Sequence, residues 1–232
     1  MGFNTGDTYE EKIYNICLKK HLLPEGFKRA GASAKNPDIQ ILHKSKILNI
    51  EVKNNKNPDY GQRIIHYNPL NKTWYWGKQD EVSELFENYN LRDHINQDFE
   101  PILYKKRKKG EVSYQIKSAQ PYTEEDFKFD QRSFEKPNIK VNNEALFLYY
   151  KKRHVFYIQI EDSGLYHLDN DIASLGTSQF NGRLSFRFRL KVHSSKPRHN
   201  CSFFGILKLA KKPTLSEFNM EENVLQKFPS IL

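Results

Sequence analysis

Residues 38–53, which read DIQILHKSKILNIEVK, decide the fold of this chain. Apolar and polar side chains alternate over residues 38–42 and again over residues 47–53, a pattern typical of strands with one buried face. The four residues between the two runs, 43–46, have the length of a hairpin loop. The sequence therefore predicts an antiparallel hairpin in which Leu42 lies opposite Ile47.

This register would bring two acidic side chains together. Continuing the pairing places Asp38 opposite Glu51, and directly opposite side chains in such a pair have Cβ atoms roughly 4.5–5.5 Å apart. Lys53 shares the face of Glu51, because successive side chains of a strand alternate. Two carboxylates beside a lysine suit hydrolysis of a phosphodiester: the acids could bind Mg²⁺, and the lysine could orient or help deprotonate a water. An ordinary surface hairpin is the alternative.

The same residues carry a resemblance to a known family. Pro37-Asp38, followed after twelve residues by Glu51-Val52-Lys53, resembles the signature of the PD-(D/E)XK nuclease superfamily. The resemblance covers about residues 6–67. It implies a central mixed β-sheet flanked by helices, Mg²⁺ held by Asp38 and Glu51, and double-stranded DNA as the substrate.

Two lesser candidates for the site follow from this resemblance. In the superfamily, a helix before the motif often supplies a further acid, for which Glu10 is the better candidate and Glu11 the alternative. A glutamine shortly after the lysine is also common, and Gln62 would occupy that place.

Small stand-alone nucleases of this superfamily resemble type II restriction endonucleases. That likeness implies sequence-specific cutting of double-stranded DNA, frequently by a homodimer, and a companion DNA methyltransferase that protects host DNA. A structure-specific repair or recombination nuclease is the alternative with the same chemistry. A non-catalytic nucleic-acid-binding protein is the alternative from another class.

The charge balance favours a nucleic acid partner, since 37 Lys and Arg outnumber 28 Asp and Glu to give a net charge of +9. The strongest candidate surface is residues 183–193, an alternating strand with one cationic face. A second candidate is a predicted cationic turn at residues 105–110, and a third is the polar stretch just before Asp38. The candidate DNA-binding side chains are Arg183, Arg187, Arg189, Lys191 and His193, then Lys105 and Arg107, then Lys28, Arg29, Ser33 and Lys35.

The predicted architecture is a single α+β, restriction-endonuclease-like domain over residues 1–232. We expect a catalytic core at about residues 6–104 and a β-rich DNA-recognition part at about residues 111–232. Helices are predicted at residues 7–21 and 79–89. Strands are predicted at residues 145–150, 155–160, 184–192 and 203–209, with a hairpin turn at residues 151–154 and a strand core at Trp74 and Trp76.

Composition excludes several classes of protein. Hydrophobic residues make up 38% of the chain, which is enough for a core and argues against wholesale disorder. Two cysteines cannot form a disulfide framework or a zinc finger, and no run of apolar residues is long enough to span a bilayer. The first residues lack the features of a secretory signal, so we expect a reduced, cytoplasmic protein.

Overall fold

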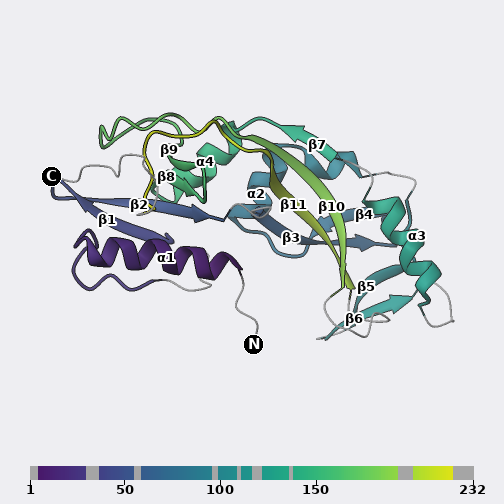
Figure 1. Ribbon diagram of the computed structural model, residues 1–232. Helices are drawn as coiled ribbons and strands as arrows, with labels where there is room; N and C mark the ends of the chain where they lie inside the picture. The colour runs from purple at the N-terminus through teal and green to yellow at the C-terminus, as the bar shows by residue number, and fades with distance from the viewer. Residues whose placement is uncertain are drawn as a thin grey trace. The chain divides into compact units, whose positions relative to one another are not determined.

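The computed structural model describes residues 5–29, 37–54, 59–95, 99–108, 111–116, 122–135, 138–192 and 201–221. These residues form an α+β fold with four α-helices, one 3-10 helix and eleven strands, which confirms the predicted fold class (Figure 1). The chain divides into two compact units whose segments interleave along the sequence. Unit 1 comprises Met1–Pro58, Leu146–Arg183 and Leu209–Leu232, and unit 2 comprises Asp59–Ala145 and Leu184–Lys208.

Unit 1 contains the predicted mixed sheet, with four strands in the order β1-β2-β8-β9. The central pair, β2 and β8, is parallel, and the two outer pairs are antiparallel. The strands are β1 (Ile39–His43), β2 (Lys46–Lys53), β8 (Val155–Ile160) and β9 (Gly164–His167).

The predicted division of the chain into a catalytic core and a DNA-recognition part concerns function, so it stays a prediction.

The hairpin of β1 and β2 has the register that the sequence predicts. Leu42 pairs with Ile47, and the pairing continues to Ile39 opposite Ile50. The turn is tighter than expected, because His43 and Lys46 also pair. Lys44 and Ser45 alone make the turn, with φ of 45° and 63°, and two successive left-handed residues are what a two-residue hairpin turn requires.

Helix α1 (Thr5–Lys19) packs on the apolar face of this hairpin. Its side chains Ile13 and Cys17 are completely buried in one cluster with Ile39 and Ile50. Because side chains alternate along a strand, this packing sends Glu51 and its same-face neighbours to the opposite face of the sheet.

A buried polar network joins α1 to the end of the described chain. The Glu221 carboxylate accepts hydrogen bonds from Tyr9 Oη at 2.9 Å, from Lys12 Nζ at 2.6 Å and from the backbone N–H of Asp162 at 3.0 Å. Gln159 Nε2 in turn donates to Tyr9 Oη at 3.1 Å. Burial alone would raise the pKa of Glu221, but these hydrogen bonds outweigh it and hold the pKa below its usual range.

Helix α4 (Glu144–Lys152) occupies residues that the sequence predicted as a strand, so that prediction is wrong. Leu146 and Tyr150 are buried four residues apart, while Leu148 between them is 56% exposed, which is the spacing of one helical face. A short, continuous apolar run does not distinguish a strand from a buried helix. Residues 151–154 are accordingly the end of α4 and the turn before β8, and no hairpin turn forms there.

Unit 2 is built around a five-stranded sheet in the order β4-β3-β11-β10-β7. Its elements are β3 (Asp59–Asn68), β4 (Thr73–Trp76), α2 (Glu81–Asn88), the 3-10 helix Leu91–His94, β5 (Leu103–Lys108), β6 (Glu111–Ile116), α3 (Glu124–Phe134) and β7 (Asn138–Val141). It also contains most of β10 (Arg183–Val192) and of β11 (Cys201–Lys211), the parts that lie within residues 184–208. Strands β5 and β6 form a separate antiparallel pair.

Within the described part of the chain, no helix is long and apolar enough to cross a membrane.

An aromatic cluster forms the core of unit 2. Trp74 stacks on Phe134 with ring centroids 5.1 Å apart and meets the edge of Phe203 at 5.3 Å. Trp76 packs against Phe86 with ring centroids 5.2 Å apart and the rings tilted by 58°. Both tryptophans are buried, which confirms that this aromatic run is strand core.

Candidate active site

Three charged side chains lie together near the end of β2 in unit 1. Asp38 Oδ2 accepts a hydrogen bond from the backbone N–H of Val52 at 2.8 Å, which fixes the aspartate against β2. Lys53 Nζ lies 2.6 Å from Glu51 Oε1, and the Glu51 residue is only 6% exposed. The hairpin therefore brings together the two acids and the lysine that the sequence singled out.

The two carboxylate oxygens of Glu51 have different surroundings. Oε1 accepts hydrogen bonds from Lys53 Nζ and from Tyr150 Oη, the latter at 3.1 Å, and Tyr150 is itself buried on α4. Oε2 is buried and has no hydrogen-bond partner within the described residues. A buried acceptor left unpaired costs about 1–3 kcal/mol, so this oxygen is the one that would gain most from a bound cation.

The electrostatics of Asp38 also fit a cation site. Burial raises the pKa of Asp38 to about 7, the charge of Glu51 adds to the increase, and Lys53 opposes it. Mg²⁺ prefers carboxylate oxygens and keeps several waters, so it fits a pair of acids that repel each other. No group of three or more His, Cys, Asp or Glu side chains that could hold a metal occurs among the described residues. Asp38 and Glu51 would then be ligands of an ion whose shell is completed by water and substrate.

Helix α1 distinguishes between the two candidates for a further acid. The charge of Glu10 contributes to the raised pKa of Asp38, so Glu10 lies within electrostatic reach of the site. Glu11 is exposed to solvent. Glu10 is therefore the acid of α1 that this geometry associates with Asp38, and its role in catalysis stays a prediction.

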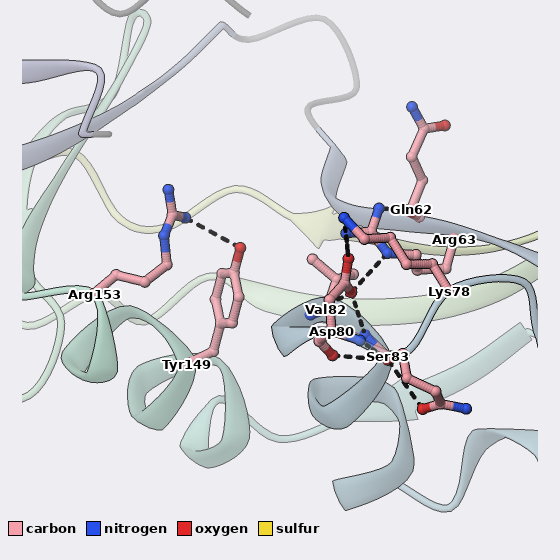
Figure 2. Close-up of polar contacts among 9 residues, drawn as sticks. Gln62, Arg63, Lys78, Asp80, Val82, Ser83, Tyr149 and Arg153 are labelled. Carbon is pink, nitrogen blue, oxygen red and sulfur yellow. Dashed lines mark hydrogen bonds and ion pairs between the residues drawn. The ribbon is translucent and has the colours of Figure 1, made fainter. Parts of the chain in front are cut away.

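Helix α4 adds residues that sequence reasoning missed. Arg153, just after α4, donates from Nη1 to Tyr149 Oη at 3.1 Å, and its guanidinium lies 5.3 Å from the centre of the Tyr149 ring (Figure 2). Burial alone would lower the pKa of Arg153, but Tyr149 and the carboxylates of Glu51 and Asp38 outweigh it and raise the pKa. A second cation thus accompanies Lys53 near the two acids.

A helical spacing could have revealed these residues in the sequence. Tyr149 and Tyr150 precede Arg153 by four and three residues, so all three share one side of a helix. The sequence contains this spacing, but it becomes a signal only when residues 145–150 are interpreted as a helix.

Gln62 is an exposed residue of β3 in unit 2, and its role in the site stays a prediction. Its neighbour Arg63 donates from Nε to Asp80 Oδ1 at 2.8 Å (Figure 2). Asp80 also accepts from the backbone N–H groups of Val82 and Ser83 and so caps α2. In Figure 2 the Gln62 side chain points away from this cap, so it takes no part in it.

The candidate DNA-binding residues lie in several different elements, and the structure agrees with some of the predictions made for them. Four cationic side chains of β10 have the alternation that was predicted: Arg183 and Arg189 are exposed, and Arg187 and Lys191 are partly exposed. Their role in binding stays a prediction.

The other candidates lie in loops and in β5. Lys28 is exposed and Arg29 is partly exposed in the loop after α1. Lys105 and Arg107 lie in β5, so the prediction of a cationic turn at residues 105–110 is wrong for residues 105–108. The side chains that lie outside the described part of the structure are those of Ser33, Lys35, Lys105, Arg107 and His193.

No protein-family model, curated protein or solved structure matches this chain. Its function is therefore inferred from the geometry of its own residues.

Proposed function

We propose that this chain is a Mg²⁺-dependent endonuclease that cuts double-stranded DNA at specific sequences, as a type II restriction endonuclease does. The observation that carries the proposal is the grouping of Asp38, just before β1, with Glu51 and Lys53 of β2. Glu51 Oε1 accepts two hydrogen bonds, and its Oε2 is buried with no partner among the described residues. A surface hairpin would gain nothing from burying a carboxylate in this way.

Each side chain would have a separate task. Asp38 and Glu51 would hold Mg²⁺, which when bound polarises the scissile phosphate and lowers the pKa of a water. Lys53, held at 2.6 Å by Glu51, would orient that water for attack on phosphorus. Arg153 would offset the negative charge that develops on the phosphate, because its charge already lies within electrostatic reach of both acids.

Binding would depend on other parts of the chain. The cationic face of β10 would contact the phosphate backbone or present arginines to base edges in a groove. A two-fold symmetric homodimer would let each subunit cut one strand of a palindromic site. A restriction activity also implies a companion DNA methyltransferase.

Digestion of unmodified plasmid DNA by purified protein, with and without Mg²⁺, tests the proposal. We expect discrete fragments in Mg²⁺ only, and sequencing of the ends should return one short site. Smeared products or cutting at junctions would instead indicate a structure-specific nuclease. Absence of Mg²⁺-dependent cutting over a wide panel of DNA would indicate a binding protein without catalysis.

A further inference from the structure

A cavity of about 480 Å³ lies between α3 and the end of β10, wholly within unit 2. Its size falls within the roughly 300–1,000 Å³ range of pockets that bind small molecules. The residues that give it chemical character are Phe127, Gln131 and Glu135 on the side of α3, and Arg187, Arg189 and Lys191 on β10. An aromatic ring, an amide and three cations therefore face one hollow, against a single carboxylate.

The three cations are spaced regularly. Arg187, Arg189 and Lys191 alternate with apolar residues and so share a face of β10, about 6.8 Å apart along the strand. Successive phosphates of one nucleic acid strand repeat at a similar spacing. Lys191 Nζ is held 5.6 Å from the centre of the Phe204 ring. Arg187 Nε is buried and has no hydrogen-bond partner in the part of the chain that the structure describes.

The side formed by α3 is fixed to the strand by one carboxylate. Glu135 Oε1 accepts a hydrogen bond from the backbone N–H of Leu190 at 2.9 Å and another from Gln131 Nε2 at 3.5 Å. Phe127, Gln131 and Glu135 are four residues apart, so they line up along one side of the helix and its end. Phe127 is partly exposed, which leaves part of its ring accessible.

We propose that this hollow, here named the α3/β10 pocket, binds one unpaired nucleotide of a nucleic acid strand. Phe127 stacks on the base, Gln131 hydrogen-bonds to the base edge, and the three cations bind the phosphates on either side. A cationic groove together with an aromatic ring on which a base can stack is typical of proteins that bind single strands. A paired base offers no free face, so the bound nucleotide is either part of a single strand or extruded from a duplex.

This inference rests on the proposed function for the β10 cations, since Arg187, Arg189 and Lys191 belong to the face already proposed to contact DNA. It is separate from the proposed chemistry, because none of its residues belongs to the Asp38–Glu51–Lys53 group. Binding to a fluorescein-labelled oligothymidine in EDTA, followed by fluorescence anisotropy, measures it without any cutting. We expect the full-length protein to bind the single strand more tightly than a duplex of equal length. A duplex with a one-nucleotide bulge distinguishes the two sources: tight binding to it indicates an extruded base, and weak binding indicates a single strand.

Substitutions at the pocket should weaken this binding in a defined order. Phe127→Ala should weaken it about tenfold, since stacking contributes this much or more per base, while Phe127→Trp should preserve it. Arg189→Ala should weaken binding and reduce the slope of log affinity against log salt by about 0.7. Lys128→Ala and Phe129→Ala are matched controls on the same helix outside the pocket, and both should bind as the wild type does.

Two results would contradict the proposal that the α3/β10 pocket binds a nucleotide. One is equal affinity of Phe127→Ala and wild type for the single strand, and the other is an equal loss in Phe129→Ala. The nuclease proposal can fail independently. If the protein binds the oligonucleotide through Phe127 but never cuts DNA, nucleotide binding in the α3/β10 pocket is supported and the proposed nuclease activity is contradicted.

Discussion

Strands β2 and β10 both carry an apolar face and a charged face, yet the charged faces are built differently. On β2, Glu51 is 6% exposed and is bonded to both Lys53 and Tyr150. On β10, Arg183 and Arg189 are exposed, and the charged face is almost entirely cationic. Burial and hydrogen bonding fix the positions of side-chain atoms, and catalysis requires such fixed positions. Exposed cations attract phosphates without needing a fixed geometry. Substitutions of Glu51 or Lys53 on β2 should therefore slow cutting severely, and those of the β10 cations should weaken binding gradually.

The largest effect is expected for Lys53→Ala. Losing the group that orients the attacking water should slow cleavage about 10³-fold, within the range for acid–base groups. Affinity for duplex DNA should change little, because Lys53 is largely enclosed by its contact with Glu51. Single-turnover cleavage and anisotropy measure the two quantities separately.

Lys46→Ala is the control for this experiment, since Lys46 is an exposed lysine at the start of the same strand. Its cleavage rate should match that of the wild type. Equal cleavage rates for Lys53→Ala and Lys46→Ala would contradict the claim that the charged face of β2 carries out catalysis.

Glu221→Gln should give the next largest effect, and it tests whether buried charge also stabilises unit 1. Removing the charge that Lys12 and Tyr9 contact should lower the free energy of unfolding by roughly 1–3 kcal/mol at neutral pH. Because the folded pKa of Glu221 lies below its usual value of 4.5, wild type has this stability above that pH and loses it as pH falls through the folded pKa. Urea unfolding should show a constant difference between variant and wild type well above pH 4.5 that shrinks as the pH falls below 4.5, and a pH-independent difference would contradict this.

Tyr150→Phe should have a moderate effect on metal affinity. Without the Tyr150 hydroxyl, Lys53 is the one hydrogen-bond partner left to Glu51 Oε1 among the described residues, and the carboxylate can turn away from the cation. We expect about tenfold weaker Mn²⁺ binding by calorimetry, in line with the loss of a group that orients a metal ligand. Tyr75→Phe in unit 2 is the control. Unchanged Mn²⁺ affinity in Tyr150→Phe would mean that the tyrosine only fills space.

The smallest effect is expected for Arg189→Ala on duplex DNA. Loss of one phosphate contact should weaken binding a few-fold and reduce the salt slope by about 0.9. Cleavage at saturating DNA should proceed as in the wild type. A collapse of the cleavage rate at saturation would show that β10 takes part in chemistry.

The sequence predicted those parts of the fold that depend on neighbouring residues, and it failed where the structure depends on contacts between distant segments. The register of β1 and β2 follows from strict alternation and a short loop, and it is observed as predicted. The identity of α4 depends on which surface covers the polar side of the sheet, and the run at residues 145–150 carries no alternation that could reveal it. Tyr150 and Arg153 were missed for that reason. Tyr150 reaches the site through a contact across 99 residues of chain, with Glu51, and Arg153 reaches it through the charges of Glu51 and Asp38.

The central claim is that the Glu51 carboxylate holds a catalytic metal ion, and Glu51→Gln tests it most directly. The amide has the same shape and can still bond to Tyr150, but it carries no charge to bind Mg²⁺. The measurement is the initial rate of plasmid cleavage against Mg²⁺ concentration, with duplex affinity determined in parallel. We predict that wild type cuts only with Mg²⁺ and that Glu51→Gln binds DNA normally but cuts at least about 10²-fold more slowly. Cleavage by Glu51→Gln at the wild-type rate would contradict the account.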